Sequence, residues 1–266
     1  IEFVGEVVEA GAEARGVKPG DRVMCTGECG WAEYAVADWR RAVPLPANNM
    51  TWSQAATLPV ALQTMHNAIV TNGGLSAGES ILIQGASSGV GLMGLQIARA
   101  MGARLVIGSS TNRERRARLT EFGADLAVDS RDESWVQQVL DATGGKGVDL
   151  IVDQISGYVA SQNLAATAIQ GRIVNVGRLG GFTGEFNFDL HAMRRIRYIG
   201  VSFRTRSIEE VEEIVRAMKA DLWNAVEAGD LALPLDREYA LAHAPEAVAY
   251  MKANRHFGKV VLTVGD

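Results

Sequence analysis

The chain has 266 residues, of which 47% are hydrophobic and 21% charged, and its formal net charge is −5. This length predicts one large or two modest domains with a sizeable core, and the acidic balance argues against a nucleic-acid surface. No apolar run approaches the ~20 residues that cross a bilayer, so we expect no membrane partner. Cys25 and Cys29 are too few for a disulfide framework, which favours a cytoplasmic protein.

The head of the chain predicts short strands joined by turns, over 3–8, 22–25 and 33–36. Helical periodicity follows, with Ser53 as the expected N-cap and Pro59 starting a second helix. This head is too short to close a barrel alone. We therefore expect that its opening strands are missing and that the tail strand 259–264 pairs with it.

Strands and helices alternate from Ser80 to Val201, which predicts a parallel sheet covered on both faces. The expected strands are 80–84, 104–108, 126–128, 148–153, 171–176 and 196–202. A helix over 208–228, with one apolar stripe, leads out of this region. The predicted fold is α/β: a Rossmann-type doubly wound parallel sheet inserted in a discontinuous, mostly β domain.

A glycine-rich turn joins the first strand of this region to its helix, in the order Gly85-Ala-Ser-Ser-Gly-Val-Gly91. A helix that opens there directs unpaired N–H groups and the positive end of its dipole toward the turn, where a pyrophosphate can bind. Small residues let the phosphates approach closely. We expect pyrophosphate contacts from Ala86, Ser87, Ser88, Gly89, Val90 and Gly91.

The same glycine pattern occurs in short-chain dehydrogenases, which place a lysine four residues after a catalytic tyrosine to lower the phenol pKa. Here the residues four positions after the tyrosines are Asp38, Gln162, Ser202, His243 and Asn254. None is lysine, so this alternative fails on its chemistry.

Several motifs together resemble the medium-chain dehydrogenase/reductase superfamily, and within it the zinc-independent quinone oxidoreductase branch. They are Gly5-Glu-Val-Val8, Pro19-Gly-Asp-Arg-Val23, Ala55-Ala-Thr-Leu-Pro59, the glycine turn, Gly123-Ala-Asp125, Gly147-Val-Asp149 and Gly258-Lys-Val-Val-Leu262. The resemblance implies a partial GroES-like substrate domain over 1–57, a Rossmann dinucleotide-binding domain over 58–229 and a return to the GroES-like domain over 230–266.

The end of the second strand of the nucleotide domain indicates which dinucleotide binds. An NAD site carries a carboxylate there for the ribose hydroxyls. This chain has Ser109 and Ser110, followed by Arg113 and Arg115, which are residue types that hold a 2′-phosphate. We therefore expect NADPH, although a charge cluster at a helix start is also typical of an ordinary solvated surface.

The resemblance implies further cofactor contacts from residues spread along the chain. Thr64 and the pair Val176–Gly177 would lie beside the nicotinamide, and Asp153 where the adenine side passes. His256 and Lys259 would border the nicotinamide half. A structural role as a cap, turn or satisfied polar group is an open alternative for each.

No metal is expected. In the alignment that the resemblance implies, Ile1 and Val60 fall where zinc members of the superfamily place catalytic ligands, and neither side chain can coordinate. The four-cysteine structural zinc loop is absent, and Cys25 and Cys29 cannot complete a tetrahedral site.

The expected function is an NADPH-dependent, zinc-independent reductase that transfers hydride to a quinone or an α,β-unsaturated carbonyl. The proton donor of such relatives lies in an earlier segment, so no catalytic residue is named. Two alternatives stay open: an enoyl reductase of a polyketide or acyl pathway, and a catalytically silent nucleotide-binding protein. The predicted edge strand 196–202 is where the family commonly dimerises, so we also expect a homodimer.

Overall fold

The computed structural model describes residues 1–265 and consists of two compact units. One unit joins Ile1–Gln63 to the chain from Phe203 onward, and the other is Thr64–Ser202. The nucleotide domain expected over 58–229 is longer than this second unit at both ends, because helix α8 (Ile208–Ala228) makes its contacts within the first.

The second unit is built on six parallel strands in the order β6-β5-β4-β7-β8-β9. This is the doubly wound arrangement expected from the sequence, in which the strand order reverses next to the first strand. The strands are β4 (Ser80–Gln84), β5 (Leu105–Ser109), β6 (Leu126–Val128), β7 (Val148–Asp153), β8 (Thr167–Asn175) and β9 (Arg197–Gly200).

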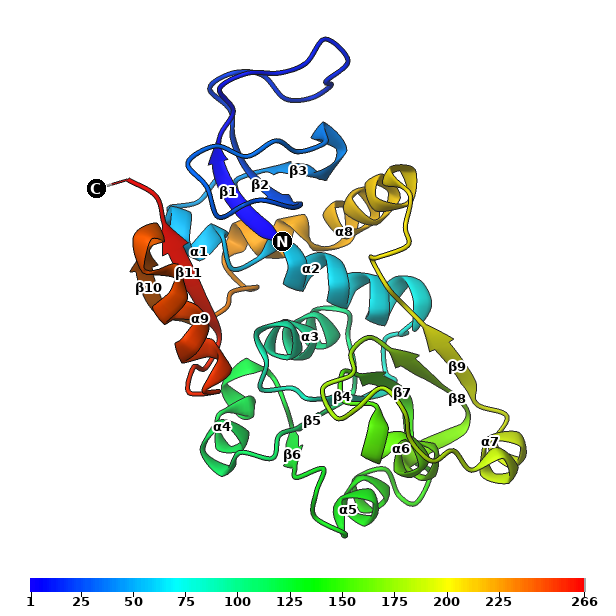
Figure 1. The fold of residues 1–266 in the computed structure, drawn as a ribbon. Coiled ribbons are helices and arrows are strands. Elements are labelled where there is room, and N and C mark those ends of the chain that lie inside the picture. The colour runs from blue at the N-terminus through cyan, green and yellow to red at the C-terminus, as the bar shows by residue number, and fades with distance from the viewer. Residues whose placement is uncertain (266) are drawn as a thin grey trace. The chain divides into compact units, whose positions relative to one another are not determined.

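The central strands of this sheet are buried on both faces, because successive side chains point to opposite sides and helices cover each side. Leu82, Ile107 and Ile151 pack with Trp135 and Leu164 from the helices of one face. Figure 1 shows helix α3 on one side of the sheet and helices α5 and α6 on the other. The α-helices of the unit after its first strand are α3 (Gly89–Ala100), α4 (Arg113–Ala117), α5 (Trp135–Ala142), α6 (Ala160–Ala166) and α7 (Phe188–Arg194).

The first unit contains two small sheets instead of one. Strands β1 (Glu2–Glu6), β2 (Arg22–Thr26) and β3 (Ala42–Pro44) form an antiparallel sheet. Strands β10 (Leu235–Ala240) and β11 (Lys259–Thr263) pair in parallel. The expectation that the tail strand 259–264 pairs with the head was therefore wrong: the chain supplies a nearer partner at 235–240.

Two further head predictions were wrong. Residues 33–36 form no strand, and Val36 is 96% exposed, because within residues 1–265 no neighbouring strand pairs with them. Thr51, not Ser53, caps helix α1 (Trp52–Ala55), since the Thr51 and Gln54 side chains form a reciprocal capping box. Helix α2 (Pro59–His66) begins at Pro59 as predicted and continues into the π-helix η2 (Asn67–Asn72).

Helix α8 has the predicted bounds and apolar stripe. Ser207 and Glu210 form a capping box at its start, and Gly229, with a φ of 80°, ends it. In the first unit, Arg40 donates to Glu209 at 3.2 Å, and the Asn48 amide donates to the carbonyls of Val226 and Glu227. Among residues 1–265, none of the helices combines the length and apolar character that a membrane span requires.

Candidate functional site

The turn after β4 leaves two backbone N–H groups open at the start of a helix. Gly85 adopts a φ of +73°, and the Ser88 hydroxyl accepts the Gly91 N–H at 3.0 Å. The Leu92 N–H donates to the Ser88 carbonyl. The first N–H groups of a helix have no helical carbonyl one turn earlier to donate to. The N–H groups of Gly89 and Val90 therefore point out of the helix, toward any anion held at the turn.

Gly91 permits the close approach of helix α3 to the turn. A Cβ atom at this position would lie 2.6 Å from the Gly85 carbonyl oxygen and 2.7 Å from the Ala86 Cα. Both neighbours are backbone atoms and cannot move aside cheaply. Ala86 itself is buried, and its N–H donates to the Ser109 carbonyl.

The two serines at the end of β5 play different parts. The Ser110 hydroxyl donates to Ser87 Oγ at 2.9 Å and so joins the end of β5 to the glycine turn, and the Ser110 residue is 4% exposed. Ser109 is fully buried; it donates to Gln84 Oε1 at 2.6 Å and accepts the Gly85 N–H at 3.0 Å. The expected direct phosphate contact from Ser109 was therefore wrong. This hydroxyl instead holds the Gly85 N–H and so supports the turn from inside the protein.

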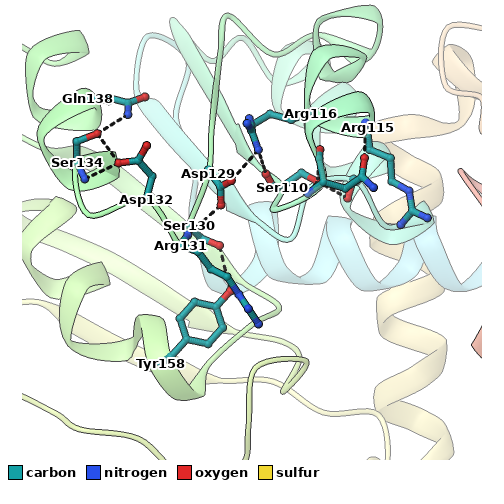
Figure 2. A network of polar contacts seen from close by, with 12 residues as sticks. Ser110, Arg115, Arg116, Asp129, Ser130, Arg131, Asp132, Ser134, Gln138 and Tyr158 are labelled. Atoms are coloured by element: carbon teal, nitrogen blue, oxygen red, sulfur yellow. Dashed lines mark hydrogen bonds and ion pairs between the residues drawn. The ribbon is translucent and has the colours of Figure 1, made fainter. Parts of the chain in front are cut away.

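The arginines after β5 are also unequal. Asn112 caps α4 through the Arg115 N–H, and Arg113 is exposed while Arg115 is half-buried. The Arg116 guanidinium donates to the Ser110 carbonyl at 2.8 Å and to Asp129 at 2.9 Å (Figure 2). The charge of Arg116 is thus paired with Asp129 across the end of the sheet. Arg113 and Arg115, on the same short helix, are the α4 arginines that the sequence proposed for a phosphate.

Sequence reasoning missed two residues beside this cluster. The Arg131 guanidinium lies over the Tyr158 ring at 5.5 Å from its centroid, and the Tyr158 hydroxyl lies 3.1 Å from Ser130 Oγ (Figure 2). Ser130 and Arg131 lie in the loop after β6, and Tyr158 lies in the segment after β7, so these residues lie at the carboxyl edge of the sheet. A cation in the loop that follows a predicted strand was the available signal for Arg131.

Asp153 ends β7 but faces the protein interior. Its side chain is fully buried, one carboxylate oxygen accepts the N–H groups of Ile155 and Ser156, and the other accepts the Asn163 amide at 3.0 Å. Burial raises the pKa of this carboxyl, and the three N–H donors oppose that shift. The expected direct cofactor contact from Asp153 was therefore wrong, because both carboxylate oxygens accept hydrogen bonds from the protein's own N–H groups.

Val176 and Gly177 follow β8 and are tied to the same loop. Their N–H groups donate to the Asp153 carbonyl at 2.8 and 3.1 Å. A Cβ at Gly177 would lie 2.6 Å from the Gln154 carbonyl oxygen, so glycine is required for this packing. Both residues are partly exposed at the edge where the nicotinamide is expected.

Thr64 is partly exposed on α2, while His256 and Lys259 belong to the first unit. Lys259 pairs with Glu2, whose second oxygen accepts the Val60 N–H at 2.8 Å. The charge of Lys259 is therefore compensated within its own unit. The His256 ring lies 6.5 Å from the Tyr250 ring centroid.

The donor set does not fit a zinc ion. Among residues 1–265, His, Cys, Asp and Glu side chains form no cluster of three that could hold a metal. Cys25 is buried in the head sheet, and this burial raises the pKa of its thiol to about 11, which disfavours the thiolate that zinc binds. Cys29 is exposed.

A dinucleotide does fit the second unit. The open N–H groups of Gly89 and Val90 suit a pyrophosphate, and the arginines of α4 are of a residue type that suits a further phosphate. Asp129 and the Ser110 carbonyl both accept hydrogen bonds from the Arg116 guanidinium, so the Asp129 carboxylate is already paired.

Two family models match this chain. Residues 1–47 match the alcohol dehydrogenase GroES-like domain, and residues 89–220 match the zinc-binding dehydrogenase model. Among curated proteins, a mycocerosic acid synthase-like polyketide synthase of Mycobacterium tuberculosis is 30% identical over 265 residues, or 99% of this chain. The chain spans only 12% of that relative's length.

Solved structures give the same picture. A probable oxidoreductase from Mycobacterium abscessus is 30% identical with a TM-score of 0.85, over 99% of this chain and 79% of that one. The JamJ enoyl reductase is 25% identical with a TM-score of 0.85, over 99% and 78%. A quinone oxidoreductase of Pseudomonas syringae is 26% identical with a TM-score of 0.83, over 98% and 80%.

The matched models stand in the order expected, with the GroES-like part before the nucleotide-binding part, and the six-stranded sheet carries the glycine turn at its centre. Identity to a solved oxidoreductase extends over nearly the whole chain. The chain therefore belongs to the medium-chain dehydrogenase/reductase superfamily.

Proposed function

We propose that this chain is an NADPH-dependent, metal-independent reductase of conjugated carbonyl compounds or quinones. The observation that carries the proposal is the glycine turn together with the cationic edge beside it. Gly85–Gly91 offers N–H groups to a pyrophosphate, and Ser110 lies hydrogen-bonded to Ser87 where a ribose phosphate would follow.

Preference for the 2′-phosphate rests on the charges at the ends of β5 and β6. The position that carries a ribose-binding carboxylate in NAD sites is Ser110 here, and the neighbouring Asp129 is paired with Arg116. Arg113 and Arg115 belong to α4, which follows β5, and Arg131 lies in the loop after β6, so we expect their guanidinium groups at this edge of the sheet. Their forked N–H donors match a phosphate better than a pair of neutral hydroxyls.

When bound, a reduced nicotinamide supplies hydride to the β-carbon of the acceptor. The chain's own residues hold the dinucleotide: the α3 N–H groups bind the pyrophosphate, and the β8 loop at Val176–Gly177 borders the nicotinamide end. An acceptor already activated by conjugation suits a site without a Lewis acid, provided that N–H or O–H donors meet the charge that develops on its carbonyl oxygen.

An enoyl reductase segment of a polyketide synthase is the second candidate. The favouring observation is that a polyketide synthase aligns over 99% of this chain while the chain spans 12% of it, and that an enoyl reductase shares the fold. A quinone oxidoreductase shares it equally well. The two candidates use the same hydride chemistry and differ in whether the acceptor is a free quinone or an acyl thioester.

Turnover distinguishes these functions. NADPH consumption is followed by its absorbance with a quinone, a simple enone and a short enoyl thioester as acceptors. Selective turnover of the thioester supports the polyketide role, and turnover of the free quinone or enone supports the first proposal. NADPH binding without turnover of any acceptor contradicts both and supports a silent nucleotide-binding protein.

Arg131→Leu is expected to weaken NADPH binding about tenfold and to leave NADH binding nearly unchanged, because a charge-assisted hydrogen bond contributes about 1.5–3 kcal/mol. Fluorescence titration with both nucleotides measures this. Arg15→Leu, which removes an exposed arginine of the first unit, is the matched control and should change neither affinity. An equal loss of NADH affinity in Arg131→Leu would contradict a phosphate contact.

A homodimer along β9 is also proposed. Strand β9 ends the six-stranded order, and Phe188 and Met193 of the neighbouring α7 are 76% and 67% exposed. Val201 donates its N–H to Asn175, so the Gly200 N–H faces the open edge. Gly200→Pro should remove an edge donor without breaking the β8–β9 ladder and should shift a dimer toward monomer in light scattering. An unchanged dimer mass would contradict the proposal.

A further inference from the structure

A continuous line of buried hydrogen bonds runs beneath the glycine turn, from Gly85 to Asp153. The Gly85 N–H donates to Ser109 Oγ at 3.0 Å, and the Ser109 hydroxyl donates to Gln84 Oε1 at 2.6 Å. Gln84 Nε2 donates to Asn163 Oδ1 at 2.8 Å, and Asn163 Nδ2 donates to Asp153 Oδ2 at 3.0 Å. All four side chains in this relay are fully buried.

The two ends of the relay determine its direction. Gly85 contributes a backbone N–H, which only donates, and an ionised Asp153 only accepts. Ser109, Gln84 and Asn163 between them can each point either way, but only one direction leaves every group satisfied. The Ile155 and Ser156 N–H groups occupy the other Asp153 oxygen and hold the carboxylate in place.

We propose that Asp153 is a positioning residue, whose carboxylate sets the direction of this relay and so holds Gly85 and the turn after it in the conformation that binds the dinucleotide. This inference rests on the proposed NADPH binding and deepens it. Asp153 acts at a distance, through three neutral side chains, instead of touching the ligand.

The same carboxylate also organises the neighbouring loops at this edge. Ser156 has a φ of 56°, which is strained for a residue with a side chain, and its hydroxyl donates to the Gly177 carbonyl at 2.7 Å. The Ser156 N–H bond to Asp153 helps to hold that conformation. The loops after β4, β5, β7 and β8 are thus linked through one buried charge.

Moving the charge by one step tests the proposal. In Asp153→Asn, the Ile155 and Ser156 N–H groups retain the side-chain oxygen, so the amide N–H faces the Asn163 amide. The relay must then reverse, and the Ser109 hydroxyl loses its acceptor. In Asn163→Asp, two carboxylates face each other. In the double variant Asp153→Asn/Asn163→Asp, the carboxylate at 163 accepts from both neighbours, and the direction from Gly85 onward is restored.

We expect each single variant to bind NADPH about tenfold more weakly. A buried hydrogen bond that is left unsatisfied lowers the binding affinity by on the order of one factor of ten. The double variant should bind within about threefold of the wild type. Asp149→Asn is the matched control: it lies at the opposite end of β7, where its carboxylate accepts the Ser80 N–H and hydroxyl. It should lower the unfolding midpoint but not NADPH affinity.

A pH profile adds a readout that general destabilisation would not move. In Asn163→Asp, one proton on the carboxyl pair recreates a donor toward Asp153, so NADPH affinity relative to the wild type should rise between about pH 8 and about pH 6. The other charged or titratable groups that act on Asp153 are Arg178 and Tyr198. Burial raises the pKa of Tyr198, so its phenol stays neutral over this range. The double variant should follow the wild type.

Several results would overturn the inference: wild-type affinity in Asp153→Asn, a double variant no better than the weaker single, or recovery of the unfolding midpoint without recovery of NADPH affinity. If Asp153→Asn does not fold, Ser109→Ala removes only the last link and should still weaken NADPH binding about threefold to tenfold. Wild-type protein that binds no NADPH contradicts the proposed function instead. The unfolding midpoints of the two single variants at 153 and 163 and of their double variant then decide whether the relay has the stated direction.

Discussion

Gly91→Ala should weaken NADPH binding at least about tenfold and destabilise the second unit by about 1–3 kcal/mol, the usual cost of forcing a methyl group into a packed site. The added Cβ would lie 2.6 Å from the Gly85 carbonyl oxygen and 2.7 Å from the Ala86 Cα. Relief requires α3 to move away from the turn, which displaces the N–H groups of Gly89 and Val90. Nucleotide titration and urea unfolding measure the two effects.

Gly94→Ala is the control for that experiment, because it adds the same methyl group on the same helix. Its Cβ would lie 3.0 Å from Met65 Sδ, at the end of a flexible side chain that can give way. Alanine also improves helix propensity by about 1 kcal/mol. We expect near-wild-type stability and affinity. If Gly91→Ala and Gly94→Ala behave alike, the close approach at Gly91 does not govern binding.

Arg172→Met should lower the free energy of unfolding by about 2–4 kcal/mol, because it leaves buried carbonyl groups without their donor and Glu79, whose side chain is 28% exposed, without its partner. Arg172 is 5% exposed, and its guanidinium makes two hydrogen bonds to Glu79, at 2.9 and 2.7 Å. It also donates to the carbonyls of Gly73, Gly74 and Asp149. These bonds join the C-terminal end of the π-helix η2 to strands β7 and β8 of the sheet.

Arg216→Met provides the comparison for Arg172. The Arg216–Glu213 pair lies on α8 with both side chains more than half exposed, and solvent screens it. Its removal should cost less than about 1 kcal/mol. Equal losses from the two substitutions, measured by urea unfolding, would show that burial of Arg172 contributes nothing.

The sequence predicted the central sheet well for a physical reason. The runs 80–84, 126–128 and 148–153 became strands with those bounds, because buried strands of a parallel sheet are nearly continuous apolar runs bounded by turns. Strand β8 begins at Thr167 instead of the expected 171, and its pairing with β7 shifts register there. Such a shift depends on the neighbouring strand, which local sequence does not contain.

The dependence on neighbouring strands also explains which site residues could be predicted from the sequence and which could not. The turn at Gly85–Gly91 depends on local residue types and could be predicted. Whether a residue at the end of a strand faces the edge or the interior depends on its rotation in the sheet, and Ser109 and Asp153 turned inward. The Arg116–Asp129 pair depends on the register of β5 against β6, so the sequence could not separate Arg116 from Arg113 and Arg115.

We propose that the carboxyl edge of the six-stranded sheet holds a 2′-phosphorylated nicotinamide dinucleotide. Fluorescence titration of the wild type and of Arg115→Glu with NADPH and with NADH tests it most directly. We predict tighter wild-type binding of NADPH than of NADH, and a loss of about tenfold or more in Arg115→Glu that is confined to NADPH. Equal wild-type affinities for the two nucleotides, or an equal loss of both in the variant, would contradict phosphate recognition by these arginines.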